Sequence, residues 1–468
     1  MPVYHIQPQD LLFFRDARPM EPQSPGGGHG ARWPHPAVFF DAIHSALWRA
    51  FPDAASRELK GFSHHSFFFK KKNGERLPVS SQRTWFQSLR TAGPFPVRDG
   101  RWLFPCPADV QPNGGLVLPV TAYQGTSDLL GPPLYPLGST SLSSKATVAP
   151  WWSKDAIEAY LAGCAQLGQR QAFEPHQLFA AEWTTGIGTD PLRDTQDGRR
   201  IYSAQYLRLR DDVRIGLWAT LPERGPNGKD FDGLDAIFRQ NAELPILLVG
   251  GQQRSCRVVR QDTADSAADL ATLLPVSRPL PPDCTRLKWV LLSPAVFPAV
   301  PKQHHQGGWL PTWVHPQTGS VLLNEVRLDR TPDGGIHRKD RRSTKRPGFL
   351  THCRLVAACI PKPVPITGWT EALHAPPRDA LDDQQQPIAD RRPRGPRETH
   401  LAVPAGAAYY FECPDHSTAQ ALWGLLSWHG EQTRKVDHIV HSRSSLLGEK
   451  GFGLGICAEW KPFPALKP

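Results

Sequence analysis

Apolar residues recur along the first half of the chain with two different periods. Alternating or continuous apolar runs predict strands, and apolar positions three and four residues apart predict helices. Phe39, Ile43 and Leu47 follow the helical spacing, and Pro36 suits the first turn of that helix. The predicted elements, in chain order, are a strand at 3–6, a helix at 37–49, strands at 201–209 and 213–220, a helix at 231–240 and a strand at 244–249. The two middle strands are expected to form a hairpin around the turn 210–212.

The second half repeats this order less completely. Strands are predicted at 288–292, 351–360, 407–412 and 456–458, and a helix is predicted at 417–428 with Ser417 as its N-cap. The helix that would follow the first of these strands is not visible in the pattern. Two units with the order strand, helix, strand, strand, helix, strand predict an α+β fold of two ferredoxin-like domains with long, loop-rich insertions.

Proline and glycine are concentrated in blocks, and these blocks mark the expected insertions. The first domain is expected at 1–262, with a large insertion at about 52–182. One helix is predicted inside this insertion, at 153–162, with Ser153 as its N-cap. The second domain is expected at 283–468, with a basic insertion at about 300–400 and a glycine turn near its end.

The net charge favours a polyanionic partner. The 468 residues include 54 Lys and Arg against 44 Asp and Glu, so the formal charge is +10 and the pI is about 9.3. Such a balance favours nucleic acid or an anionic membrane surface. No apolar stretch is long enough to cross a bilayer, and the N-terminus lacks the basic and apolar regions of a signal peptide. We therefore expect a cytoplasmic protein that does not enter a membrane.

The side chains that usually bind metals are scattered. The eight cysteines form no CxxC pair, which favours reduced thiols over a zinc site or a disulfide framework. The adjacent histidines at 64–65 and 304–305 have a poor spacing for two ligands on one helix face. A P-loop, a GxSxG elbow and an HExxH motif are all absent from the sequence. We expect neither a metal nor a cofactor.

Two glycine-rich segments allow two interpretations each. GFGLG (451–455) follows Lys450, and its bare backbone either approaches a phosphate or base, or forms a β-bulge or tight turn before the last strand. Gly26, Gly27 and Gly28, with His29, either wrap a nucleotide or form a flexible linker. The basic stretches at 327–347 and 375–397 are either solvated surface or phosphate contacts.

Short motifs, in a constant order over nearly the whole chain, resemble a known family. They are LFFRDARPM (12–20), GGG (26–28), the helix at 39–48, FPCPAD (104–109), GIG (186–188) with YSAQYLR (202–208), VGG (249–251), VPAG (403–406) with YYFE (409–412), and the C-terminal glycine turn. Together they resemble the RAMP subunit of type III-B (Cmr) CRISPR effector complexes that caps the 5′ end of the guide RNA. Met20 stands where the family more often has Phe, and Gln252 where it often has an acidic residue.

The resemblance implies a non-catalytic subunit of an antiviral ribonucleoprotein. It would bind the 5′ handle of the guide RNA and join the large polymerase-like subunit to the backbone RAMP subunits. Open sheets and glycine loops suit single-stranded RNA. The residues expected to contact RNA are Arg15, Arg18, Gly26, Gly27, Gly28, His29, Lys145, Arg193, Arg199, Arg208, Lys450, Gly451 and Gly453. For the basic residues the alternative is ordinary surface or an internal ion pair, such as Arg15 or Arg18 with Asp16.

An endoribonuclease that processes the guide RNA is the alternative function. Some RAMP relatives cleave RNA without a metal, using a histidine as general base on the 2′-hydroxyl. His29 and His44 are the candidates by position. His44 falls between Phe40 and Leu47, close to the apolar face of the predicted helix, which is typical of a packed histidine.

Overall fold

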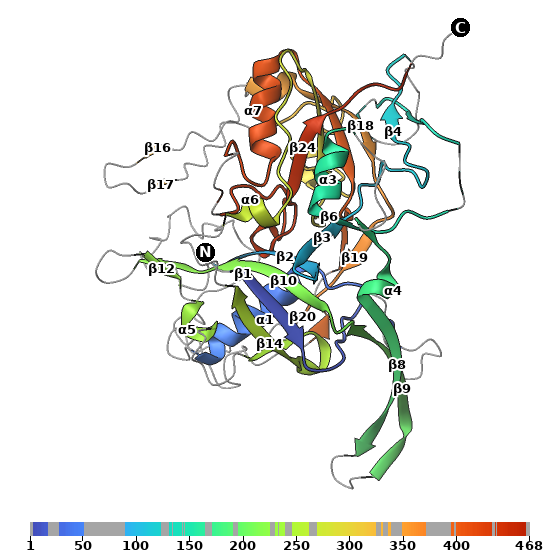
Figure 1. Ribbon diagram of the computed structural model, residues 1–468, viewed down its shortest axis with the longest axis vertical. Coiled ribbons are helices and arrows are strands. Elements are labelled where there is room, and N and C mark those ends of the chain that lie inside the picture. The colour runs from blue at the N-terminus through green and yellow to red at the C-terminus, as the bar shows by residue number, and fades with distance from the viewer. Residues whose placement is uncertain are drawn as a thin grey trace.

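The computed structural model contains two antiparallel sheets and a long two-stranded ribbon (Figure 1). The α+β class predicted from the sequence is confirmed. The structure describes residues 3–16, 28–50, 89–122, 131–132, 134–142, 144, 146–163, 171–190, 195–224, 230–232, 234–238, 246–261, 269–323, 329–330, 336–337, 349–370, 395–396, 399–432, 436 and 438–464.

The first sheet has eight strands in the order β13-β14-β1-β10-β2-β3-β6-β7, and each neighbouring pair is antiparallel. In chain order these strands are β1 (Val3–Pro8), β2 (Arg90–Arg98), β3 (Arg101–Pro105), β6 (Trp151–Ser153), β7 (Ala172–Phe173), β10 (Val213–Thr220), β13 (Ile246–Val249) and β14 (Arg254–Gln261).

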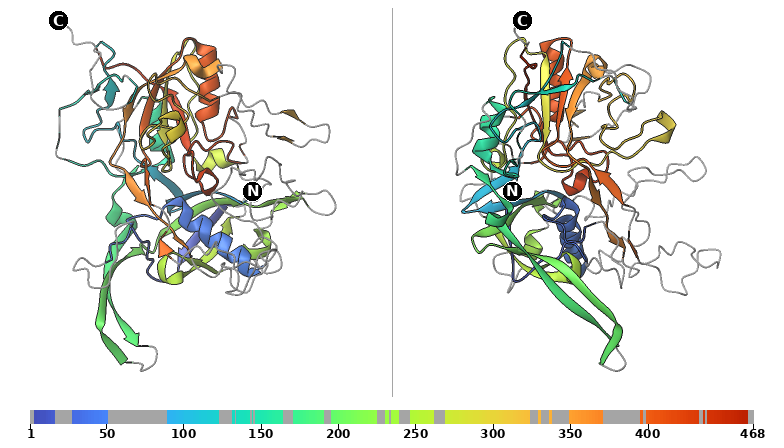
Figure 2. Two further views of the ribbon diagram at one scale, coloured as in Figure 1. Left: turned by 180° about the vertical axis from the view of Figure 1, so that it is seen from behind. Right: turned by 90° about the vertical axis from the view of Figure 1, so that its right-hand side faces the viewer.

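One face of the first sheet is covered by α1 (Pro36–Ala50) and the short α5 (Asp235–Phe238). Because strand side chains alternate between faces, Tyr4 and Ile6 point to the same side and pack with Phe39 and Ile43 of α1. Helix α1 lies behind the sheet in Figure 1 and in front of it in the left view of Figure 2. The opposite face of β1, β10 and β14 therefore points toward the viewer of Figure 1.

The second sheet has the strand order β18-β23-β15-β24. Its strands are β15 (Arg286–Leu291), β18 (Arg354–Cys359), β23 (Ala408–Glu412) and β24 (Gly455–Glu459). Helix α7 (His416–Leu426) packs on one face, where Leu422 and Trp423 meet Trp289 and Tyr409. Helix α3 (Lys154–Leu161) covers the other face, although it comes from the first half of the chain.

A single apolar core joins the two sheets. It includes Val3 and Trp218 of the first sheet, Tyr160 of α3, and Val290 and Ile456 of the second sheet. Each fully buried side chain of this size contributes about 1.5–3 kcal/mol. The two sheets are therefore held together by packing and not only by the connecting chain.

The ribbon consists of β8 (Phe179–Asp190) and β9 (Thr195–Leu209), and it extends away from the first sheet (Figures 1 and 2). The remaining strands form two-stranded pairs: β4 (Val117–Pro119) with β5 (Leu137–Ser139), β11 (Pro222–Arg224) with β12 (Asp230–Asp232), β16 (Asp329–Arg330) with β17 (Ile336–His337), β19 (Val364–Ile366) with β22 (His400–Ala402), and β20 (Trp369–Thr370) with β21 (Gly395–Pro396). The short helices are α4 (Pro175–Leu178), α6 (Leu270–Leu273), η2 (Gly251–Gln253), η3 (Pro301–Gln303), η4 (Phe349–His352) and η6 (Gly448–Lys450).

Local signals in the sequence located most helix positions correctly. The helix predicted at 37–49 is α1, and the helix at 153–162 is α3, whose cap Ser153 accepts a hydrogen bond from the Ala156 N–H at 3.2 Å. Helix α7 lies where a helix was predicted, but the cap prediction was wrong. Asp415 caps it, accepting the Thr418 N–H at 2.8 Å, while Ser417 donates to Asp415. Of the helix predicted at 231–240, the described residues form β12 and the short α5.

The predicted hairpin of 201–209 with 213–220 is wrong. Strand β9 pairs with β8 along the ribbon, whereas β10 lies between β1 and β2. Both edges of β10 are therefore occupied, and the turn at 210–212 only leads from one structure to the other. One of the two strands that pair with β10 is β2, which lies inside the segment expected to be an insertion.

Candidate nucleic-acid interface

Several separated motifs meet where the ribbon joins the segment after β1. Leu12 and Leu207 exchange backbone hydrogen bonds of 2.9 and 2.8 Å. The Gly28 N–H donates to the Ser203 carbonyl at 2.6 Å, and the Gly251 N–H donates to the Phe13 carbonyl at 2.8 Å. The described parts of the motifs at 12–20, 26–28, 202–208 and 249–251 thus form one site. We call residues 10–16, 28–31, 182–183, 203–208 and 250–254 the ribbon base.

Glycine is required here because the main chains approach closely. A Cβ atom at Gly30 would lie 2.3 Å from the Gln205 carbonyl oxygen. Gly250 has φ +68°, and a Cβ there would lie 2.5 Å from the Phe13 carbonyl oxygen. The glycines let β9, the loop at 28–31 and the turn at 250–251 converge on the segment that follows β1.

An exposed aromatic side chain stands beside this glycine loop. Trp183 of β8 is 51% exposed, and the His29 ring meets it edge-on, with centroids 5.4 Å apart and an interplanar angle of 82°. An exposed indole face is the kind of platform on which unpaired bases stack. Sequence reasoning missed Trp183. The available signal was a single tryptophan three residues before the GIG motif, in a strand whose other residues, apart from Phe179 and Ile187, are small or polar.

Arg15 lies at the centre of the ribbon base. It forms an isolated β-bridge with Gly30, and its Nε atom is buried without a hydrogen-bond partner in the part of the chain that the structure describes. A buried donor without an acceptor costs about 1–3 kcal/mol.

Gln252, the position where the family often has an acid, accepts two hydrogen bonds. The Tyr206 hydroxyl donates to its Oε1 at 2.8 Å, and Arg254 Nη2 donates to the same oxygen at 2.9 Å. The Arg254 guanidinium also lies 5.3 Å from the Tyr206 ring centroid. An amide oxygen here provides the same acceptor as a carboxylate, so the network is kept without an ion pair.

Arg208 already has partners inside the ribbon base. It forms ion pairs with Glu182 and with Asp10, the latter at 3.6 Å, and the hydrogen bond that it donates to Glu182 raises the pKa of its guanidinium. Its side chain is still about half exposed. Arg208 can therefore meet RNA only by sharing or exchanging these carboxylates.

The C-terminal glycine turn serves packing, which corrects the expectation that it contacts RNA. Gly451 and Gly453 have φ of +92° and +77°, and Cβ atoms there would lie 2.7 Å from the Thr91 carbonyl oxygen and 2.0 Å from the Ser444 nitrogen. Lys450 is 4% exposed, and its Nζ donates to Asp41 of α1 at 2.6 Å. Neither the bare backbone nor the ammonium is available to a nucleotide, so the tight-turn interpretation holds.

Several predicted contact residues lie outside the described residues. These are Arg18, Gly26, Gly27, Lys145 and Arg193. Arg199 belongs to β9, but its side chain is not described. The structure brings together Arg15, Gly28, His29 and Arg208 of the predicted set.

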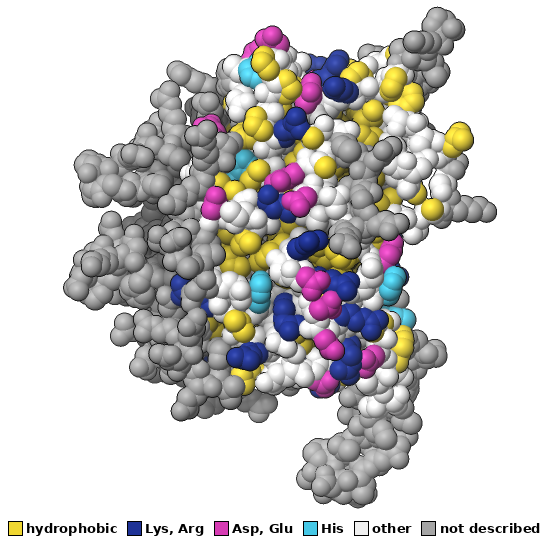
Figure 3. Space-filling view, viewed as in Figure 1, with side chains coloured by type: hydrophobic (Ala, Val, Ile, Leu, Met, Phe, Trp, Pro, Cys, Tyr) yellow, Lys and Arg dark blue, Asp and Glu magenta, His cyan; other side chains and the backbone are white. Residues whose placement is uncertain are grey.

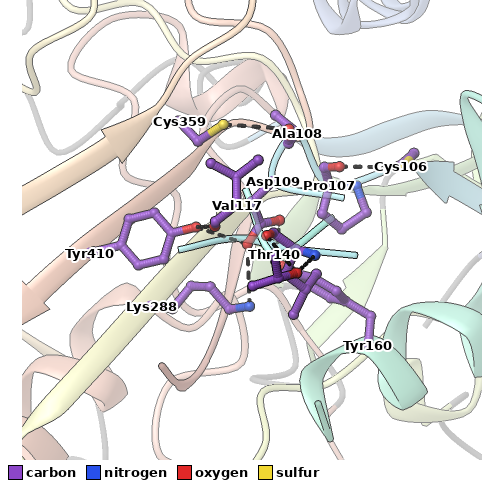
Figure 4. Close-up of polar contacts among 11 residues, drawn as sticks. Cys106, Pro107, Ala108, Asp109, Val117, Thr140, Tyr160, Lys288, Cys359 and Tyr410 are labelled. Atoms are coloured by element: carbon purple, nitrogen blue, oxygen red, sulfur yellow. Dashed lines mark hydrogen bonds and ion pairs between the residues drawn. The ribbon is translucent and has the colours of Figure 1, made fainter. Parts of the chain in front are cut away.

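The FPCPAD motif forms a buried polar cluster beneath the second sheet (Figure 4). Asp109 accepts hydrogen bonds from the Tyr160 hydroxyl at 2.6 Å and the Tyr410 hydroxyl at 2.9 Å, and Lys288 Nζ lies 3.5 Å away. Burial raises the pKa of the Cys359 thiol to about 12, with a smaller contribution from Asp109. The cluster is a connection between the sheets, and its thiol is held protonated and unreactive.

The two candidate histidines do not share a site. The His44 ring stacks on Phe40 of the same helix, with centroids 6.2 Å apart, while His29 packs on Trp183 in the ribbon base. Across the described ranges, no group of three or more His, Cys, Asp or Glu side chains is arranged to hold a metal ion. Within those same ranges, no helix has the length and hydropathy needed to cross a membrane.

Comparison with known proteins shows that the chain belongs to the class of RAMP subunits of type III CRISPR effector complexes. Residues 4–440 match the model of the family described as CRISPR-associated protein (Cas_Cmr3), and the chain belongs to this family. The resemblance inferred from the sequence motifs is confirmed. No curated protein sequence matches the chain.

Solved structures resemble the chain at low identity. A chain of the type III-B Cmr-beta complex bound to cognate target RNA and AMPPnP is 13% identical, with 87% of this chain and 86% of that chain covered and a TM-score of 0.37. A chain of the Csm3–Csm4 subcomplex of the type III-A interference complex is 8% identical, with 89% and 93% covered and a TM-score of 0.36. A chain of the Csm1–Csm4 cassette with AMPPNP is 13% identical, with 64% and 78% covered and a TM-score of 0.28.

Proposed function

We propose that this chain is a non-catalytic subunit that holds the 5′ handle of the guide RNA at the ribbon base. We further propose that it joins the large polymerase-like subunit to the backbone RAMP subunits. The RNA-binding part rests on the ribbon base itself, and the bridging part rests on family membership. The observation that carries the proposal is the half-exposed Trp183, which is flanked by His29 of the loop that bridges Arg15 and Ala204.

Two parts of this site suit two parts of a nucleotide. The indole of Trp183 offers a stacking face to a base. Arg15 is half-buried, and its guanidinium suits a phosphate. The glycines on both sides of His29 pack against β9, which holds the His29 ring beside the indole.

The stacking contribution sets the size of the expected effect. Loss of one base–aromatic contact costs about 1–3 kcal/mol. Trp183→Ala is therefore expected to weaken RNA binding roughly five- to hundredfold, whereas Trp183→Phe keeps a ring and most of the affinity. Leu401→Ala is the matched control, because it removes a side chain that is 58% exposed and lies outside the ribbon base.

The test is fluorescence anisotropy with RNA labelled at its 3′ end. One RNA carries the 5′ sequence found on guide RNAs that co-purify with the protein, and the other carries that sequence scrambled. We expect Trp183→Ala to lose affinity for the first RNA and most of the preference over the second. If Trp183→Ala binds both RNAs as Leu401→Ala does, the ribbon base is not the handle site.

The same samples test the alternative function. Labelled guide precursor incubated with the wild-type protein is expected to remain intact on a denaturing gel. Cleavage that disappears in His29→Ala or His44→Ala would contradict the non-catalytic part of the proposal.

We propose that each sheet is the core of a ferredoxin-like domain, with limits at 1–262 and 283–468. With β1, β2, β10 and β14 as strands one to four, the first sheet has the order 4-1-3-2. With β15, β18, β23 and β24 in the same roles, the second sheet has that order too. Helices α1 and α5 fill the two helix positions of the first unit, and α7 fills the second position of the other.

A further inference from the structure

Five neighbouring strands of the first sheet carry charge of one sign only. The strands β13, β14, β1, β10 and β2 contain no aspartate or glutamate. They contain six arginines, which are Arg90, Arg98, Arg214, Arg254, Arg257 and Arg260. Figure 3 views the face of this sheet that α1 does not cover, and Lys and Arg side chains gather in the lower half, with Asp and Glu among them.

Part of this face is open to solvent. Arg257 is exposed and lies in register between Ile246 of β13 and Gln7 of β1, and Val259 lies opposite His5. Ile246 is 37% exposed and Val259 is 38% exposed, whereas Val258, which points to the other face, is buried. The strand register thus sets a row of small apolar side chains beside guanidinium and imidazole groups.

The nearby carboxylates already have cationic partners. Asp212 pairs with Arg98 at 2.7 Å, and Asp10 pairs with Arg208 and Arg254 at the ribbon base. Arg214 donates to the carbonyls of Asp211 and Val213, and Arg257 has no ion-pair partner in the described residues. Burial lowers the pKa of His5, and the positive charge of Arg214 lowers it further. Among the described residues, the carboxylates near this face are therefore paired with other arginines, and Arg257 is left without an ion-pair partner.

This face adjoins the ribbon base. The Gln9 N–H donates to the Ser255 carbonyl at 3.1 Å, and the Ser255 hydroxyl donates to Gln9 Oε1 at 2.9 Å. The residues on either side of this contact, Asp10 and Arg254, belong to the ribbon base. A chain that leaves the ribbon base along β14 reaches Arg257 and then Val259.

We propose that the open face of the first sheet is a second contact surface for single-stranded RNA. Arg214 and Arg257 bind phosphates, and unpaired bases lie over Val259, Ile246 and His5. Because these strands lack carboxylates, they do not repel a polyanion. Unpaired bases can pack on the exposed apolar side chains, whereas the phosphate surface of a duplex would not contact them. The inference goes beyond the handle site, because none of these residues belongs to the ribbon base.

The test compares two double variants of the full chain that lose the same charge. Arg214→Gln/Arg257→Gln removes the two guanidinium groups of the face. Arg278→Gln/Arg354→Gln is the control, since both of its arginines are exposed and lie at the second sheet. Affinity for an unstructured labelled RNA, longer than the handle, is measured at several salt concentrations. Urea midpoints confirm that each variant is folded.

We expect the face variant to bind about tenfold more weakly, because each charge-assisted contact contributes on the order of a few-fold to tenfold. Its log–log salt slope should fall by about 1.4, since each phosphate on a single strand contributes about 0.7. The control should change neither value. In a second measurement, RNA containing 4-thiouridine should cross-link to peptides of β14 or β1 in the wild type.

The outcomes separate this inference from the proposed function. If Trp183→Ala weakens binding while the face variant keeps the wild-type affinity and slope, the open face does not bind RNA and only the handle site stands. The reverse pattern would leave the open face and remove the handle site. Unchanged RNA binding together with loss of a co-purifying subunit would assign the face to a protein partner and overturn the inference.

Discussion

Asp109→Ala is expected to destabilise the whole molecule, because this carboxylate joins the two halves of the chain. Asp109 is fully buried and accepts hydrogen bonds from Tyr160 of α3 and Tyr410 of β23. Lys288 of β15 is 5% exposed and has Asp109 as its ion-pair partner at 3.5 Å. After the substitution the ammonium keeps, among the described residues, only the Tyr160 ring, whose centroid is 4.0 Å away.

The magnitude follows from the groups left without partners. Removing one member of a buried ion pair costs about 3–5 kcal/mol, because the remaining charge stays in an apolar environment. The Tyr160 hydroxyl loses its acceptor, at a further cost of about 1–3 kcal/mol. Tyr410 also donates to the Val117 carbonyl at 3.2 Å, so its hydroxyl remains paired. Lys288→Met in the same background removes the isolated charge and should restore about 3 kcal/mol.

The assay is urea unfolding of Asp109→Ala, Lys288→Met and the double variant, followed by tryptophan fluorescence and circular dichroism. Asp155→Ala is the control, since it removes an exposed carboxylate from α3 and should cost less than about 1 kcal/mol. The reasoning requires the double variant to be more stable than Asp109→Ala. It is refuted if the two single costs add in the double variant to within about 0.5 kcal/mol, because independent sites behave in that way.

Two further predictions concern the glycine turn and the buried His429. Gly453→Ala should cost several kcal/mol more stability than Gly163→Ala in urea unfolding. Both glycines have positive φ, but only at Gly453 would the added Cβ meet a neighbour, 2.0 Å away. Equal costs would show that the turn is not packed as described. Burial lowers the pKa of His429 to about 4, and its Nε2 accepts the Ser277 N–H at 2.9 Å. Since the unfolded state binds the proton first, this contribution to stability is complete above pH 6.5 and declines by up to about 3 kcal/mol toward pH 4. His429→Asn should lose less stability than the wild type between pH 7 and pH 5, and an unchanged pH dependence would contradict the assignment.

The sequence pattern located elements better than it located their partners. Helices α1 and α3 were predictable because spacing and capping are local properties of the chain. The pairing of β9 with β8 depends on which edges are free in the folded sheet, which adjacency in sequence does not report. Strand β2 was hidden because Pro94 and Pro96 punctuate it, although it lies inside the sheet between β10 and β3.

Glycine-rich segments show a second limit of sequence reasoning. A bare main chain serves a ligand or a packed neighbour equally well, and only the fold shows which of them is present. At the C-terminus the neighbour is protein, since a Cβ at Gly455 would lie 1.9 Å from the Trp289 indole nitrogen. At the ribbon base the glycines let main chains converge beside an exposed indole, a side chain that the pattern of the sequence did not single out.

Four strands of the first sheet have the same order as the four strands of the second sheet, but the two sheets offer different surfaces. On the second sheet, α7 covers one face, while α3 and the FPCPAD segment cover the other, so that Lys288, Val290 and Tyr410 are all buried. The first sheet is covered by α1 on one side only, and its open part is rich in arginine. The helix that closes the second sheet comes from the first half of the chain. We infer that repetition of the sheet did not repeat the binding surface: the second sheet anchors the first, and the proposed RNA contacts among the described residues lie on the first sheet and its ribbon.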